Sequence, residues 1–107
     1  MQTEATSTFG IGTRWYDSFC NEFQKYPNIE KVLVFGSRAR RSHKRFSDID
    51  LCLFGEGLNE QDAQKIKLAL EDLLHPYMVD VLSFNTITSS DLKNSILRDG
   101  LTFYEKK

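Results

Sequence analysis

The sequence predicts one α/β domain of the α+β kind, in which a small mixed β-sheet is flanked by helices. The chain has 107 residues, of which 40% are hydrophobic and 27% charged, enough for one modest core and too few for a second. Short β-branched and aromatic runs end at glycines, as interior strands do. Stretches with apolar residues at helical spacing lie before and between these runs, so helices are expected to pack on the sheet.

The N-terminal part is predicted to contain a tail and a helix. Residues 1–12 are polar with two glycines, which predicts a flexible N-terminal tail and a single domain over residues 13–107. A helix is predicted over residues 13–26, because aromatic residues recur there at helical spacing until Pro27 ends the pattern. We expect this aromatic stripe to form core rather than to stack on a cofactor, because packing alone explains its periodicity.

The rest of the chain is predicted to alternate between strands and helices. Strands are predicted at 31–35, 47–54 and 78–84, with a short one at "LTFYE", and helices at 59–77 and from 88 to about 100. The first two strands are joined by a loop and should pair directly, whereas a helix crosses over before the third. The predicted sheet is therefore mixed.

Composition and isolated polar residues exclude several classes of protein. Fourteen Lys and Arg against fifteen Asp and Glu give a net charge of -1, so the whole molecule is not built to coat nucleic acid. Cys20 and Cys52 lie in apolar stretches without metal-ligand spacing, which favours buried thiols in a reducing compartment. His43 and His75 have no partner at catalytic spacing and are expected at the surface. The sequence has no signal-like start and no apolar run of bilayer length, so we expect a cytoplasmic protein without membrane contact.

Asp48 and Asp50 are the first candidate site residues. They are two apart on a predicted strand, so both carboxylates should point to one face while Ile49 and Leu51 point to the other. The repulsion between such close carboxylates can be relieved by a proton, by a buried arginine or by a divalent cation. Magnesium suits the pair, because it keeps several waters and takes further oxygen ligands from a substrate phosphate.

Asp80 is a third acidic candidate, in the middle of the apolar stretch "MVDVLSF". An acid in such a strand is rarely fully buried unless something pairs with it. If its strand lies beside the strand at 47–54, Asp80 completes a three-carboxylate site with Asp48 and Asp50. Taken alone, Asp80 fits an edge strand that faces water equally well.

Gly36 and Ser37 follow a predicted strand and begin a basic segment. Glycine lets the backbone turn sharply, and the first N–H groups of a helical turn can receive a phosphate. The alternative is a plain strand-to-helix turn with Ser37 as its N-cap. Five cations lie within eight residues from Arg38 to Arg45, so one or two of these arginines are candidates for contact with a triphosphate or an acceptor.

These features together resemble the G-S-x10-D-x-D signature of the nucleotidyltransferase superfamily that includes DNA polymerase β. The glycine and serine at 36–37 are followed by ten residues, then Asp-Ile-Asp at 48–50, then Asp80 on a later strand. The short chain and the wording "GSRAR", "SDIDL" and "VDVL" look like the minimal nucleotidyltransferase domains, many of which are antitoxins paired with HEPN toxins. The resemblance covers residues 32–104 and has one departure, because Arg41 stands where the family commonly has glycine.

The resemblance implies a polymerase β palm-like fold and a transferase reaction. Its implied reaction moves a nucleoside monophosphate, AMP from ATP, to a hydroxyl and releases pyrophosphate. The implied partners are ATP or another nucleoside triphosphate, two Mg²⁺ ions, a HEPN-type toxin that carries the acceptor, and a second copy of the chain. The implied catalytic and metal-binding residues are Asp48, Asp50 and Asp80, and the implied nucleotide-binding residues are Gly36, Ser37 and Arg38.

Two other functions compete with this interpretation. A non-catalytic antitoxin or binding module would keep the fold as a scaffold and act by direct contact, but it has no need for clustered acids that cost stability. Nucleic-acid binding through the basic segment at 38–45 is disfavoured by the balanced net charge and by the lack of interleaved aromatic residues.

Overall fold

The computed structural model describes residues 7–39 and 48–106, and its strands form the predicted mixed sheet. The elements in chain order are β1 (Ser7–Thr8), β2 (Ile11–Gly12), α1 (Thr13–Phe23), β3 (Lys31–Phe35), β4 (Ile49–Phe54), α2 (Glu60–Glu71), β5 (Val79–Ser83), the 3-10 turn η2 (Phe84–Thr86), α3 (Ser90–Asp99) and β6 (Leu101–Glu105). The main sheet has the order β5-β4-β3-β6. β3 pairs antiparallel with β4 and β6, while β4 pairs parallel with β5 after the α2 crossover. Among the helices described, none is long and apolar enough to cross a membrane.

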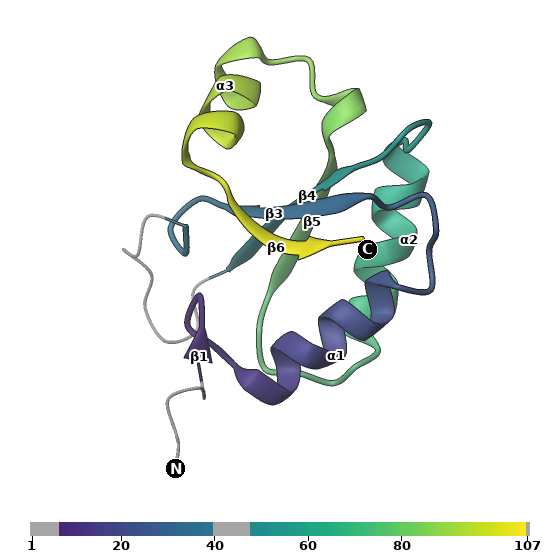
Figure 1. Ribbon diagram of the computed structural model, residues 1–107, viewed down its shortest axis with the longest axis vertical. Helices are drawn as coiled ribbons and strands as arrows, with labels where there is room; N and C mark the ends of the chain where they lie inside the picture. Colours follow the sequence, from purple (N-terminus) through teal and green to yellow (C-terminus); the bar gives the residue numbers. More distant parts are fainter. Residues whose placement is uncertain (1–6, 40–47, 107) are drawn as a thin grey trace.

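The sheet lies between two unequal layers of helix. Figure 1 shows α1 and α2 on one side of the sheet and α3 on the other. Alternate residues of β4 separate the two sides: Ile49 and Leu51 are fully buried in the main core with α1 and α2, whereas Cys52 packs with Ile96 of α3. Asp50 alternates with Ile49 and Leu51, so its side chain belongs to the α3 side.

Two helices end earlier than the sequence predicts. The predicted helix at 59–77 stops at Glu71, because Asp72 caps it and Leu74 then takes a left-handed conformation with φ 59°. The chain therefore leaves α2 before reaching Pro76, the residue predicted to end it. α1 likewise stops at Phe23, ahead of Pro27.

The predicted N-terminal tail is corrected from residue 7 onward. β1 and β2 form an antiparallel hairpin whose turn uses positive φ angles at Phe9 (56°) and Gly10 (77°). Ile11 is fully buried, and the ring of Phe9 stacks on Phe103 with 5.8 Å between centroids. Two apolar side chains are thus enough to anchor a segment whose composition is otherwise polar. The remaining residues of the predicted tail, 1–6, lie outside the described residues.

Both cysteines are free thiols in the structure, as the sequence predicts. Cys52 is fully buried, and burial raises the pKa of its thiol to about 12. The Sγ of Cys20 lies 3.7 Å from the carbonyl oxygen of Phe103, and burial raises the pKa of this thiol as well. Neither cysteine has the lowered pKa of a reactive thiol.

His75 is not the surface residue that the sequence predicts. Its ring packs edge-on against Phe19 with 4.9 Å between centroids, and its Nδ1 accepts a hydrogen bond of 3.1 Å from the backbone N–H of Tyr77. Burial lowers the pKa of His75, and this effect exceeds the opposite effects of the Leu70 backbone and the Glu71 carboxylate. The neutral imidazole therefore packs at the edge of the hydrophobic core.

We expect His75 to make the fold less stable in mild acid. Its pKa is lowered in the folded state, so the unfolded chain takes up a proton first, near the ordinary histidine pKa of about 6.5. The stabilising contribution is complete above that pH and is lost as the pH falls toward the folded pKa. Urea unfolding from pH 7 to pH 5 should show a smaller fall in the free energy of unfolding for His75→Gln than for the wild type. Parallel pH profiles for the two proteins would contradict this prediction.

Candidate active site

Asp50 and Asp80 lie side by side on neighbouring strands. They are register partners in the parallel pair β4 and β5, so both carboxylates extend on the α3 side of the sheet. This places Asp80 beside Asp50, on the neighbouring strand where the sequence predicts it. β5 is also at the edge of the described sheet, and the Asp80 side chain is 60% exposed, so the alternative interpretation of an edge-strand acid is partly right.

Asp48 lies immediately before β4 and is exposed. Within the described ranges, 7–39 and 48–106, no group of three His, Cys, Asp or Glu side chains is close enough together to hold a metal ion. The metal site predicted at Asp48, Asp50 and Asp80 therefore stays a prediction. What the fold provides is the backbone register that brings two of the three carboxylates to adjacent positions.

Gly36 touches the carboxylate of Asp50. Gly36 has φ 74°, and a Cβ built on it would lie 2.5 Å from Oδ2 of Asp50. A side chain at this position would clash with the acid and would also strain the backbone. Glycine is thus required here for two separate reasons, a left-handed turn and a close approach.

Ser37 follows Gly36 in a turn over residues 36–39. The first residue of the turn, Gly36, lies close to the Asp50 carboxylate, and Ser37 is half-buried. No helix is assigned over residues 36–39, so the short helical turn predicted after Gly36 stays a prediction. Residues 40–47, which contain Arg41, His43 and the rest of the basic segment, lie outside the described residues.

Arg38 is buried, which sequence reasoning missed. The residue is only 1% exposed, and its Nη1 donates a hydrogen bond of 2.9 Å to the carbonyl oxygen of Phe9. Its guanidinium carbon lies 5.3 Å from the centroid of the Tyr77 ring. Burial lowers the pKa of Arg38, and the nearby Tyr77, Asp48 and Asp50 act in the opposite direction. The predicted contact between Arg38 and a nucleotide stays untested, and this burial disfavours it, because the side chain offers a ligand almost no surface.

A cleft of about 280 Å³ opens beside Asp50 and Asp80. Its walls come from β3, β4, β5 and α2, and the lining residues are Phe35, Asp50, Glu60, Gln64, Lys67, Asp80, Val81 and Leu82. The ammonium of Lys67 lies 3.6 Å from Oδ1 of Asp80. Sequence reasoning missed Lys67, although the i, i+4, i+7 spacing of Glu60, Gln64 and Lys67 already puts these polar residues on one face of α2.

A larger groove of about 610 Å³ runs between α1 and β6. It is lined by Tyr16, Cys20, Tyr26 and neighbouring residues and holds none of the predicted acids. Size alone would favour this groove, but the chemistry favours the smaller cleft, because the predicted acids Asp50 and Asp80 line it together with Lys67.

Two acids of the nucleotidyltransferase signature, Asp50 and Asp80, lie on adjacent strands of a mixed sheet, close to the Gly-Ser turn. The family model described as polymerase beta, nucleotidyltransferase, matches residues 19–107, and the chain belongs to this family. The predicted enzyme class, nucleotidyltransferase, is thereby confirmed. A curated protein of Methanocaldococcus jannaschii, provisionally named a protein adenylyltransferase, is 39% identical over 74 residues, which cover 68% of this chain and 77% of the relative.

Solved structures agree with the family assignment. One described provisionally as a minimal nucleotidyltransferase is 31% identical, with a TM-score of 0.62 over 80% of this chain and 86% of that one. A toxin-antitoxin structure with AMP-PNP has a TM-score of 0.71 at 18% identity and covers 86% of this chain and 74% of that one. A tri-AMPylated Shewanella oneidensis HEPN toxin in complex with MNT antitoxin has a TM-score of 0.59 at 18% identity, covering 85% and 73%. At 18% identity, the last two structures show a shared fold.

Proposed function

We propose that this protein is a magnesium-dependent adenylyltransferase that moves AMP from ATP to a hydroxyl of a HEPN-type toxin and so acts as an antitoxin. The observation that carries the proposal is the convergence of Asp50, Asp80 and Gly36 at one point of the fold. Further support comes from the name of the Methanocaldococcus relative, and from structural neighbours that include an AMP-PNP complex and an AMPylated HEPN toxin.

The carboxylates of Asp48, Asp50 and Asp80 are of the chemical type that binds magnesium. Carboxylate oxygens are the hard ligands that Mg²⁺ prefers, and the missing side chain of Gly36 leaves room for the Asp50 carboxylate. We assign Asp48, Asp50 and Asp80 as the residues that would hold two ions. When bound, such ions neutralise phosphate charge and lower the pKa of an acceptor hydroxyl.

The rest of the mechanism concerns groups of this chain. The acceptor oxygen attacks the α-phosphorus of ATP, the bond from that phosphorus to the bridging oxygen breaks, and pyrophosphate leaves. Asp80 lies at the exposed edge of the site, where it can take the proton of the acceptor hydroxyl. The Ser37 hydroxyl and the backbone N–H groups of the turn after Gly36 would hold the terminal phosphates.

The cleft beside Asp50 and Asp80 lies at the lower end of the size range of ligand pockets. A cleft of about 280 Å³ is below the roughly 300–1,000 Å³ usual for ligand pockets. We propose that the toxin, or a second copy of this chain, supplies the missing wall around the nucleobase. The nucleotide site would then form fully only in the complex.

A non-catalytic binding module is the second candidate. The observation that favours it is that the described residues contain no ready group of three metal-ligating side chains. In this alternative the domain contacts its partner directly and has no use for ATP. Calorimetry separates the two functions, because only the transferase needs magnesium-dependent ATP binding.

The proposed reaction is tested with ATP radiolabelled at the α- or at the γ-phosphate. We expect a HEPN-type toxin mixed with this protein, ATP and Mg²⁺ to take up the α-label and not the γ-label, because AMP rather than phosphate is transferred. Mass spectrometry should find one or more added AMP groups on toxin hydroxyls, a tyrosine first. Transfer of the γ-label would indicate a kinase reaction, and absence of both label transfer and ATP binding would support the binding module.

A further inference from the structure

Arg38 combines deep burial with a position next to the site. Among the Lys and Arg residues of 7–39 and 48–106, Arg38 alone is buried. A buried charge is costly unless hydrogen bonds and opposite charges compensate it. Arg38 is also only two residues beyond Gly36, which touches Asp50.

The contacts of Arg38 connect three separate segments of the chain. Its Nη1 binds the carbonyl oxygen of Phe9 in the β1–β2 hairpin at 2.9 Å. Its guanidinium carbon lies 5.3 Å from the ring centroid of Tyr77, two residues before β5, the strand that carries Asp80. The hydroxyl of Tyr77 in turn accepts a hydrogen bond of 3.2 Å from the backbone N–H of Gly12. Hairpin, turn and strand are thereby held as one unit.

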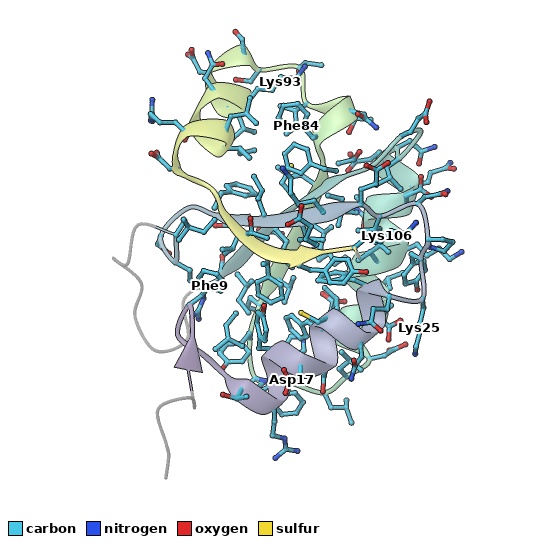
Figure 2. The ribbon with its side chains drawn as sticks, viewed as in Figure 1. Phe9, Asp17, Lys25, Phe84, Lys93 and Lys106 are labelled. Atoms are coloured by element: carbon cyan, nitrogen blue, oxygen red, sulfur yellow. The ribbon has the colours of Figure 1, made fainter. Side chains whose placement is uncertain are left out.

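The hairpin is shaped to make this contact. Phe9 has φ 56°, a left-handed conformation that bulky residues rarely adopt, and the carbonyl group at this strained turn is the one that Arg38 binds. Figure 2 labels Phe9 at the hairpin, beside the turn at 36–39 that follows β3. The ring of Phe9 stacks on Phe103 and fixes the turn from the other side.

The charge of Arg38 acts on the acids. Asp48 and Asp50 both favour its charged form against the effect of burial, so their carboxylates lie within electrostatic reach. A guanidinium within electrostatic reach of two carboxylates relieves part of the repulsion between them. Lysine is a poor substitute, because a planar guanidinium can lie on a ring and donate a hydrogen bond at the same time.

We propose that Arg38 is a positioning residue, which holds Asp48, Asp50 and the Gly36–Ser37 turn in place from inside the protein and is itself anchored by the hairpin at 7–12. The hairpin thus supports the active site, although it precedes the region that matches the family, residues 19–107. The inference rests on the proposed function as far as the role of the acids is concerned. The structural part of the inference, that Arg38 orders the turn and the start of β4, does not depend on the proposed function.

The first experiment measures local order without any need for activity. Hydrogen exchange is compared for the wild type, Arg38→Met and the matched control Arg98→Met, whose arginine is exposed and lies on α3. We expect faster exchange in Arg38→Met for peptides over 36–39 and 48–54, with peptides over α3 unchanged, and no change in the control. Unchanged exchange, or a uniform increase along the whole chain, would overturn the inference.

The second experiment separates positioning from nucleotide contact. In the AMP transfer assay, Arg38→Met should raise the Mg²⁺ concentration that gives half-maximal rate by about tenfold, because loss of a group that orients metal ligands weakens metal binding. The KM for ATP should change little. A raised KM for ATP with unchanged Mg²⁺ dependence would indicate direct contact with the nucleotide and would overturn it. If Arg38→Met does not fold, Arg38→Lys and Tyr77→Phe replace it, because the first keeps the charge and the second removes only the hydroxyl that binds Gly12. Absence of transfer activity in the wild type would overturn the proposed function but not the role of Arg38. The hydrogen-exchange experiment tests that role separately.

Discussion

Asp50→Asn is expected to lower the rate of AMP transfer by about 100-fold or more, since several kcal/mol of transition-state stabilisation are lost with a metal ligand. Asn has nearly the same shape as Asp, so the contact with Gly36 and the pairing of β4 with β5 should remain. Removing a negative charge next to Asp80 lessens repulsion, which offsets the loss of a charge that favours the buried Arg38 guanidinium, so the free energy of unfolding should change little. The substitution therefore separates chemistry from folding.

The measurement is transfer of the α-label of ATP to the toxin, with circular dichroism and urea unfolding as tests of the fold. Asp17→Asn is the matched control, because Asp17 is an exposed acid on α1, away from the site (Figure 2). Asp48→Asn should behave like Asp50→Asn. Ser37→Ala should lose less activity, since the backbone N–H donors of the turn remain. Equal label transfer by the wild type and Asp50→Asn would refute the assignment of Asp50.

Local patterns account for what the sequence predicts correctly. The run of five residues at 31–35 is β3 with the predicted bounds, because β-branched and aromatic residues there end at a glycine. Alternation in β4 puts Ile49 in the core and leaves Asp50 on the other side. The crossover before β5 then brings Asp80 beside Asp50, because parallel strands separated by a helix commonly become neighbours.

Long-range contacts account for what the sequence does not predict. Arg38 belongs to a basic run that looks like a solvated loop, and its burial depends on Phe9, which lies 29 residues earlier in the chain. His75 follows α2 and looks like a surface residue until α1 packs on it through Phe19. Lys67 shows only the spacing of an exposed helix face, and its pairing with Asp80 requires that α2 lie over β5. Each of these roles is decided by tertiary packing, which local patterns do not record.

Some aromatic contacts on the α3 side are of the same long-range kind. Phe84 of η2 stacks on Phe54 at the end of β4 with 4.7 Å between centroids. The ammonium of Lys93 on α3 lies 5.5 Å from the centroid of Phe84, and Figure 2 labels both residues near the top of the molecule. These contacts attach the small α3 layer to the sheet at the end of β4, whereas Asp50 lies near its start. The helix that lines the cleft beside Asp50 and Asp80 is α2.

Gly36→Ala is expected to cost both stability and activity, by two different mechanisms. Gly36 has φ 74°, and an L-residue in this conformation is destabilised by about 1–2 kcal/mol. The added methyl group would also lie 2.5 Å from Oδ2 of Asp50. This oxygen is at the end of a side chain that can rotate, so the clash is relieved by moving the carboxylate rather than by unfolding. A displacement of about 1 Å in a catalytic group can cost about 100-fold in rate.

Gly57→Ala is the control that separates the two mechanisms. Gly57 has nearly the same backbone conformation, φ 79°, but a Cβ there would meet nothing within 4 Å. Both variants should therefore lose a similar free energy of unfolding in urea, while only Gly36→Ala should lose AMP transfer when both are assayed fully folded. Equal activity of the two variants would mean that the contact between Gly36 and Asp50 has no role in the reaction. Loss in Gly36→Ala alone would show that the glycine is required because the carboxylate of Asp50 must occupy the space that a side chain would fill.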